Sequence, residues 1–91
     1  MTDIDLRGAV REAVGALLQL PLTAGQDEAT LAELAPERYH SLGVLDCVGL
    51  VERRFDVSID LVDDDLRTTF RSIAAISALV ARKRRDAAVL G

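Results

Sequence analysis

The sequence has few of the side chains from which enzyme sites and aromatic cores are built. Its 91 residues include no tryptophan, two phenylalanines, one tyrosine, one histidine and one cysteine. The core must therefore consist mainly of Ala, Val, Ile and Leu. One histidine and one cysteine leave little from which to build a stand-alone catalytic site. The lone Cys47 also excludes an internal disulfide and a cysteine-based zinc site within one chain.

Long apolar runs are absent as well. No segment approaches 18 consecutive apolar residues, and the acidic N-terminus has no apolar stretch of signal-peptide length. We therefore expect a cytoplasmic protein without membrane contact. The length predicts a single domain over 1–91, with a folded core over about 4–83. Residues 84–91 are expected to form a frayed basic tail.

Acidic residues outnumber basic ones, 15 against 11, and the net charge is −4. The acids are concentrated between residues 39 and 66, where seven of them accompany only Arg53 and Arg54. A surface of this sign repels phosphate backbones and attracts basic protein surfaces. Nucleic acid is thus disfavoured as a partner, and proteins with basic patches are favoured.

Apolar side chains at helical spacing predict three main helices. The first begins at Thr2 or Asp3, either of which can cap it, and ends near residue 20, before Pro21. The second begins at Ser41, and the last begins near Thr69. The predicted fold is all-α: a small bundle of three main helices plus a short helix, with a long loop between helices one and two.

The connections between these helices are expected to contain shorter elements. Thr30 and Glu33 have the spacing of a capping box, which predicts one helical turn over 31–35. Residues 55–61 alternate apolar and polar side chains, but the sequence offers no second strand to pair with them. We therefore expect an extended linker whose alternate residues are buried. A short helix is expected over 63–67.

Ser41 stands where a loop meets the second predicted helix. Serine is a favoured N-cap residue, and many such serines have no further role. The backbone N–H groups and the dipole at a helix N-terminus also favour an anion, so a hydroxyl at this point is well placed to carry a phosphate ester. Position alone does not decide between these interpretations.

The residues that follow Ser41 resemble those of a known family. Residues 41–57 read SLGVLDCVGLVERRFDV, and residues 69–76 read TFRSIAAI. The first segment resembles the second helix of acyl and peptidyl carrier proteins, which have a Glu-x-x-Phe motif whose Phe follows the serine by fourteen residues, as Glu52 and Phe55 do here. The second segment looks like the start of that family's fourth helix. The resemblance covers about residues 4–83 and is specific over 41–80.

The resemblance implies an acyl-carrier-like bundle that bears a cofactor. In the family, a phosphopantetheinyl transferase moves 4'-phosphopantetheine from coenzyme A onto the serine, here Ser41. The thiol of this arm then holds an acyl or aminoacyl group as a thioester. The implied partners are the transferase, an enzyme that loads the acyl or aminoacyl group, and a downstream synthase or transferase. The protein itself would be a monomer without catalytic residues or a metal. The face that partners contact would comprise His40, Leu42, Leu45, Asp46, Gly49 and Glu52.

The sequence departs from the family pattern around and beyond Ser41. His40 replaces the aspartate that helps the transferase to recognise the serine, and Arg38 and Tyr39 replace a small Gly-x pair. Arg53 and Arg54 stand where many fatty-acid carriers have acids. These departures favour polyketide or nonribosomal-type secondary metabolism over generic fatty-acid synthesis. The alternative is an unmodified, carrier-like module for protein interaction.

Other chemistry-bearing residues favour structural interpretations. Adjacent residues at a helix start do not normally face one another, so His40 beside Ser41 makes a poor nucleophile–base pair. Cys47 stands among apolar neighbours and is expected to be a small core or half-buried residue rather than a reactive thiol. The acids at 63–65 lack the features of a calcium loop and are expected to be a solvated helix start and partner surface. The cations at 82–85 are expected to be a solvated helix end rather than an anion or membrane site.

Overall fold

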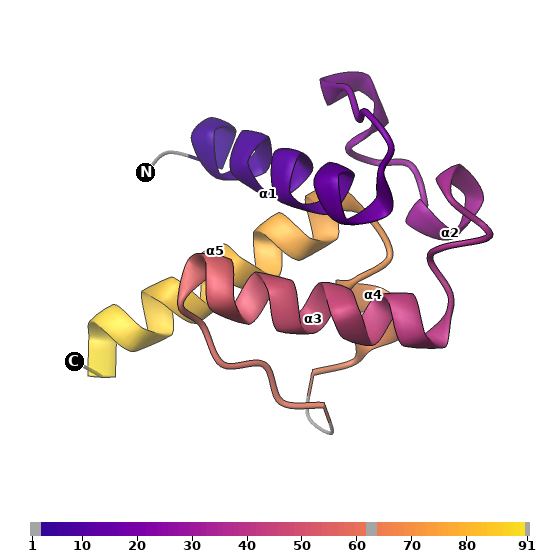
Figure 1. Cartoon of the computed structure of the whole chain (residues 1–91). Coiled ribbons are helices and arrows are strands. Elements are labelled where there is room, and N and C mark those ends of the chain that lie inside the picture. Colours follow the sequence, from indigo (N-terminus) through magenta and orange to yellow (C-terminus); the bar gives the residue numbers. More distant parts are fainter. Residues whose placement is uncertain (1–2, 62–63, 91) are drawn as a thin grey trace.

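The computed structural model describes residues 3–61 and 64–90, and the side chains of 5–61 and 64–86 (Figure 1). The described residues form helices and loops without a strand, so the all-α prediction is confirmed. No helix in this part of the chain has the length and apolar character needed to cross a bilayer. The elements are α1 (Asp3–Leu18), the 3-10 helix η1 (Ala24–Gln26), α2 (Leu31–Leu34), α3 (Ser41–Phe55), α4 (Leu66–Thr69) and α5 (Ile73–Leu90).

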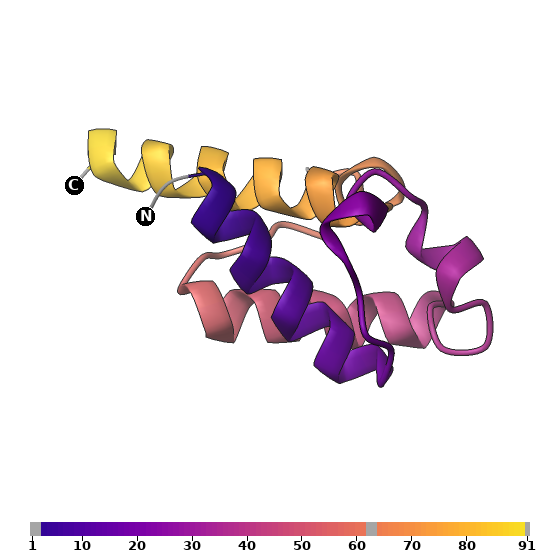
Figure 2. The same ribbon diagram turned by 90° about the horizontal axis from the view of Figure 1, so that it is seen from above.

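The three long helices form the body of the molecule. α1 packs against both α3 and α5, and α4 packs against α5. Seen from above, α1 lies obliquely across α3 and α5, and the C-terminal end of α5 extends past the other helices (Figure 2). The segment with η1 and α2 lies at the end of the bundle where α3 begins (Figure 1). This arrangement leaves the start of α3 beside a long, folded connection.

The core is mostly aliphatic, as expected. Each buried Val, Leu or Ile contributes about 1.5–3 kcal/mol relative to an exposed one, so this core supplies the main driving force for folding. Both phenylalanines are also buried, at opposite ends of the segment that joins α3 to α5. The side chains that are less than 2% exposed are Phe70, Leu31, Ile73, Ile76, Val10, Val14, Val51, Val80 and Cys47.

α1 ends at Leu18, earlier than expected, because Gln19 adopts a left-handed conformation with φ 54°. The N–H of Gln19 donates to the Ala16 carbonyl at 3.3 Å, and the N–H of Leu20 donates to the Gly15 carbonyl at 2.9 Å. These two bonds form a Schellman motif, which closes the helix before the proline is reached.

Two of the predicted caps differ from the structure. Thr30 precedes α2, but its side chain makes no capping bond and its Oγ1 is buried without a partner among the described residues. The capping box with Glu33 therefore does not form, although the predicted turn does. Asp3 is itself helical rather than a cap, and Thr2 lies outside the described residues.

The short helix α4 begins later than predicted, at Leu66 rather than residue 63. The carboxylate of Asp65 accepts a hydrogen bond from the Arg67 N–H at 3.1 Å and caps this helix. The last helix then starts at Ile73 rather than near Thr69, because the segment before it belongs to α4 and the turn that follows.

Both ends of α5 differ from expectation. At its start, the Oγ of Ser72 accepts a hydrogen bond from the Ala75 N–H at 3.1 Å, which satisfies one of the free donors of the first turn. At its other end, the helix continues to Leu90. The expected frayed tail over 84–91 is therefore helical as far as residue 90.

The linker after α3 begins where Asp56 takes a left-handed conformation with φ 53°. Residues 57–60 belong to no helix and pair with no strand among the described residues, as predicted for the linker, although Phe55 at its expected start is the last residue of α3. Ile59 is buried and Val57 packs against the core, but Leu61 is 58% exposed. The predicted burial of alternate residues therefore stops at Ile59.

Candidate functional site

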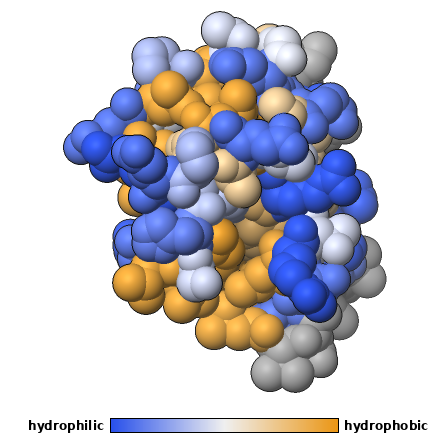
Figure 3. Space-filling model, turned by 90° about the vertical axis from the view of Figure 1, so that its right-hand side faces the viewer, coloured by the Kyte–Doolittle hydropathy of each residue, from blue (hydrophilic) through white to orange (hydrophobic). Residues whose placement is uncertain are grey.

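Ser41 is the first residue of α3, and it is exposed. The N-cap is His40, whose backbone is extended and whose side chain makes no capping bond. The predicted N-cap role of Ser41 is therefore wrong, and Ser41 occupies the N1 position. Its hydroxyl forms no hydrogen bond with any residue in the described part of the chain. Figure 3 looks onto the end of the molecule where α3 begins and shows apolar patches between hydrophilic side chains.

The loop before Ser41 is anchored in the core. Tyr39 is buried, and its hydroxyl donates a hydrogen bond to the carbonyl of Phe70, between α4 and α5. The Tyr39 N–H donates to the Ala35 carbonyl at 2.8 Å. Burial, together with the neighbouring Cys47, raises the pKa of the Tyr39 phenol, which keeps it protonated as a donor. Tyr39, two residues before Ser41, is thus held in place by one hydrogen bond from its backbone N–H and one from its side-chain hydroxyl.

Gly43 lets the same loop lie against the first turn of α3. A Cβ at this position would lie 1.9 Å from the carbonyl oxygen of Arg38, which is closer than two non-bonded atoms can approach. The sequence indicated neither Tyr39 nor Gly43 as a residue of the site. The available signal was a glycine in the first turn of an amphipathic helix, where it costs about 1 kcal/mol relative to alanine.

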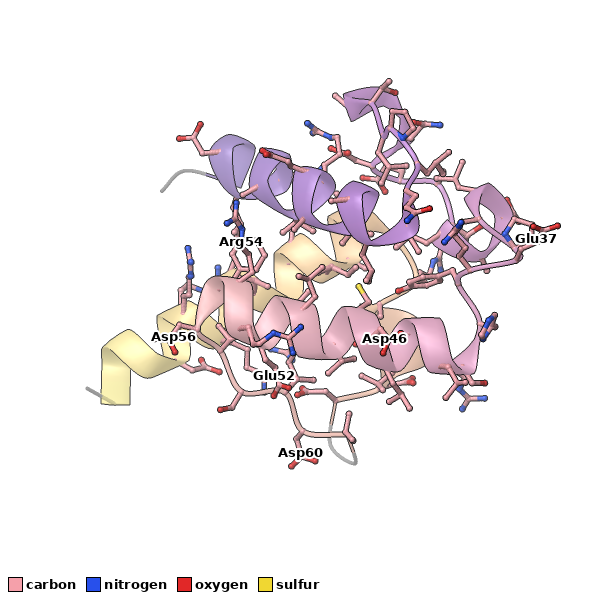
Figure 4. The ribbon with its side chains drawn as sticks, viewed as in Figure 1. Glu37, Asp46, Glu52, Arg54, Asp56 and Asp60 are labelled. Atoms are coloured by element: carbon pink, nitrogen blue, oxygen red, sulfur yellow. The ribbon has the colours of Figure 1, made fainter. Side chains whose placement is uncertain are left out.

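Most of the residues expected to contact partners form one exposed strip along α3. Leu42 and Leu45 are 69% and 47% exposed. Asp46, which follows Leu45 on the same helix, is exposed as well (Figure 4). Gly49 follows one turn later, and an Nη of Arg53 lies 3.3 Å from the position that a Cβ at Gly49 would take. The strip therefore has an apolar part and an acid near its start and a cation near its end.

Glu52 is on the side of α3 that faces the linker, and it is half-buried (Figure 4). Its Oε2 accepts a hydrogen bond from the Ile59 N–H at 3.0 Å. The carboxylate therefore holds the linker against α3. A partner contact by Glu52 stays a prediction, and the structure adds a role within the fold that the sequence did not indicate.

Asp64 is buried and its carboxylate is paired with α5. Its Oδ1 lies 3.1 Å from the Arg82 Nη2, and its Oδ2 lies 2.8 Å from the Lys83 Nζ. The Asp60 N–H also donates to Oδ2, at 2.9 Å. The hydrogen bond from Lys83 lowers the pKa of the Asp64 carboxyl below its ordinary value, against the opposing effect of burial. The predicted solvated surface at 63–65 is therefore wrong for Asp64, which instead ties the linker to α5.

The cations near the end of α5 are less free than expected. Besides the two that pair with Asp64, Arg84 lies over the ring of Phe55, with 5.6 Å between its guanidinium carbon and the ring centroid. Arg85 is exposed, as the sequence predicted for the whole group. Asp63 lies outside the described residues. Within the described chain, no cluster of three or more His, Cys, Asp or Glu side chains could hold a metal ion.

Cys47 is fully buried, which confirms the prediction. Burial raises the pKa of its thiol to about 12, although the adjacent Tyr39 hydroxyl acts in the opposite direction. A thiol that stays protonated is a poor nucleophile. Cys47 therefore behaves as a small apolar core residue.

An apolar groove of about 370 Å³ is lined in part by residues near Ser41 in the sequence. Two of its lining residues, Tyr39 and Val44, lie within one helical turn of Ser41 along the chain. The buried, unpartnered hydroxyl of Thr30 belongs to the same lining. The lining residues are Thr30, Ala32, Tyr39, Val44, Leu66, Arg67, Phe70 and Arg71.

Comparison of the chain with protein-family models, curated proteins and solved structures finds no match. The function must therefore be inferred from the geometry around Ser41. Its parts are an exposed and unbonded hydroxyl, a long helix that begins at that residue, a firmly anchored loop before it and an exposed apolar strip after it.

Proposed function

We propose that the chain is a discrete acyl or aminoacyl carrier protein that holds 4'-phosphopantetheine on Ser41. The observation that carries this proposal is the exposed hydroxyl of Ser41, free of protein bonds, at the N1 position of a 15-residue helix. Free backbone N–H groups and the helix dipole stabilise a phosphate at this point by about 0.3–1 kcal/mol. The first turn of α3 contains no acidic residue that would repel the phosphate, so the residues present fit the group.

Attachment requires one substitution at phosphorus. The oxygen of Ser41 forms a bond to the phosphorus that carries the pantetheine in coenzyme A, and the bond from that phosphorus to the bridging diphosphate oxygen breaks. Adenosine 3',5'-bisphosphate leaves with the electron pair, and the hydroxyl proton passes to the transferase. The attached group supplies a thiol that holds acyl or aminoacyl cargo as a thioester. The chain itself contributes the position of that thiol and the surface that partners recognise.

The strip along α3, together with His40, is the surface that we propose for the partner enzymes. These are the phosphopantetheinyl transferase, the loading enzyme and a downstream synthase or transferase. Leu42 and Leu45 offer apolar contact area, and Asp46 offers a charge for a basic patch. A tether raises the effective concentration of the cargo at each partner without tight binding. Arg53, close to Gly49 on this helix, favours polyketide or nonribosomal-type partners over those of fatty-acid synthesis.

The chemistry of the arm also bears on where the protein acts. Attachment consumes coenzyme A, and the arm must keep a reduced thiol to accept cargo. Thiols persist in the reducing cytosol and are oxidised in secretory compartments. We therefore place the protein in the cytoplasm, as a monomer that meets its partners one at a time.

A second candidate function is a carrier-like interaction module that never receives the arm. His40 supports this candidate, because it is the exposed N-cap residue at the position where the resemblance expects the acid that the transferase recognises. The two candidates share the same partner surface and differ only in the chemistry of Ser41.

Intact mass spectrometry separates them. The protein is incubated with coenzyme A and a broad-specificity phosphopantetheinyl transferase, and we expect a gain of one phosphopantetheine. Ser41→Ala should abolish the gain, whereas Ser58→Ala, which removes another exposed serine hydroxyl in the linker, should retain it. An unchanged mass of the wild type with several transferases would refute the carrier function and favour the interaction module.

A further inference from the structure

The first turn of α3 lacks the side-chain cap that normally holds a helix start. His40 makes no capping bond, and the Ser41 hydroxyl bonds to no described residue. Uncapped first turns leave backbone donors unpaired and open readily. Group transfer to Ser41 nevertheless requires its oxygen in a fixed place, because a displacement of about 1 Å can lower a rate roughly a hundredfold.

Two contacts from outside the helix replace the missing cap. The buried Tyr39 hydroxyl donates to the Phe70 carbonyl, 31 residues further along the chain. On the other side, the absence of a side chain at Gly43 allows the Arg38 carbonyl to approach the helix backbone. The loop is therefore held between the α4–α5 junction and the first turn of α3, and Ser41 lies directly after it.

We propose that Tyr39 is a positioning residue for the modification of Ser41. Its hydroxyl ties the backbone before Ser41 to Phe70, and Gly43 lets that backbone lie close to the helix. Tyr39 is buried and does not touch the coenzyme; it acts through the two peptide units that separate it from Ser41. This inference rests on the proposed carrier function, because the position of the oxygen matters only if a group is transferred to it.

The test compares Tyr39→Phe with Ser77→Ala. Ser77 is also buried, and its Oγ donates to the Ile73 carbonyl at 2.8 Å, so each variant loses one buried hydroxyl-to-carbonyl hydrogen bond. Phosphopantetheine transfer is followed by mass at varied carrier and coenzyme A concentrations. We expect Tyr39→Phe to lower kcat about tenfold with the KM for coenzyme A unchanged, and Ser77→Ala to stay within about twofold of the wild type. Both variants should lower the urea midpoint.

Amide exchange provides a second measurement that needs no transferase. The Val44 N–H donates to the His40 carbonyl at 2.8 Å, so its exchange rate reports the opening of the first turn. Tyr39→Phe should accelerate this exchange, and Ser77→Ala should not. If Tyr39→Phe shows no cooperative unfolding transition and is therefore not properly folded, Gly43→Ala provides a second variant. It displaces the same loop from its other side and should lower kcat in the same way.

The outcomes separate the inference from the function on which it rests. Modification of the wild type together with equal kcat values for Tyr39→Phe and Ser77→Ala would overturn the positioning role alone. Unchanged exchange of the Val44 N–H in Tyr39→Phe would also overturn it. No modification of the wild type would instead refute the carrier function, and the positioning role would fall with it.

Discussion

The carboxylate of Glu52 and the backbone N–H of Ile59 form a hydrogen bond of 3.0 Å that joins the end of α3 to the linker that follows it. Asp56 lies between them and turns the chain through a left-handed conformation. The linker therefore does not depend on pairing with another strand, because a side chain of the preceding helix satisfies the backbone at the point where Ile59 enters the core.

Removing this carboxylate should destabilise the fold. Glu52→Ala leaves the Ile59 N–H half-buried without its acceptor, and we expect the free energy of unfolding to fall by about 1–2 kcal/mol. Glu52→Gln keeps an acceptor oxygen and should lose less than half as much. Asp46→Ala, at an exposed position, should stay within about 0.5 kcal/mol of the wild type. Urea titration measures all three, and equal losses for the two Glu52 variants would contradict the hydrogen-bond explanation.

Two glycines in α3 should respond in opposite directions to alanine. At Gly43 the new Cβ would lie 1.9 Å from the backbone oxygen of Arg38, so Gly43→Ala should lower the free energy of unfolding by about 1–3 kcal/mol. At Gly49 the Cβ would meet only the mobile end of Arg53, at 3.3 Å. Gly49→Ala should therefore raise the free energy of unfolding by up to about 1 kcal/mol, which is the difference in helix propensity between glycine and alanine. Changes of the same sign in thermal or urea unfolding would refute this distinction.

Asp64 should make the fold sensitive to acid. Its pKa is lowered in the folded protein by the hydrogen bond from Lys83, so its stabilising contribution is complete above the unfolded-state pKa of about 4. It is lost as the pH falls from there through the lowered folded value. Asp64→Asn should flatten the decline of unfolding free energy over that range.

The exposed Asp46→Asn provides the control for this experiment, and it should leave the slope close to that of the wild type. Asp27 should retain a part of the acid sensitivity in Asp64→Asn. The Arg11 guanidinium, at 2.8 Å from its carboxylate, lowers the pKa of Asp27 in the same way. A variant at Asp64 with an unchanged acid slope would show that this pairing contributes nothing.

Cys47 should resist alkylation while the protein is folded. Because burial raises its pKa to about 12, the thiolate fraction near neutral pH is very small. We expect iodoacetamide to label Cys47 at least about a hundredfold faster in concentrated urea than in buffer. Under the proposed function, modified protein should take up one label rapidly, on the arm. Rapid labelling of the unmodified, folded protein would contradict the buried position.

The positions of the long helices could be predicted because they depend on apolar spacing alone. The start of α3 at Ser41 was also predicted correctly, but the end of α1 and the start of α5 were not, because those two ends depend on local backbone conformation and side-chain caps. Gln19 ends α1 with a left-handed turn, although glutamine carries no signal for one. The start of α5 is likewise decided by Ser72 rather than by the apolar residues around it.

The site was predictable to a similar extent. The spacing of apolar residues brought Ser41 to the start of a helix, but the anchor at Tyr39 depends on Phe70, 31 residues away, and no local pattern reports it. The charges in the sequence also do not show which carboxylates point into the fold and which point to solvent. Asp64 points inward to Arg82, 18 residues later, while Asp46 points to solvent.

The hydroxyl of Ser41 is exposed and free of hydrogen bonds to the described residues. A substituent placed on its oxygen therefore displaces solvent and breaks no hydrogen bond of the described chain. The chemical state of residue 41 is therefore coupled to folding only through the charge at the helix start, an effect of about 0.3–1 kcal/mol that favours the folded state when the oxygen carries a phosphate. Under the proposed function, the protein could pass through repeated cycles of charging and discharge without being refolded in any of them.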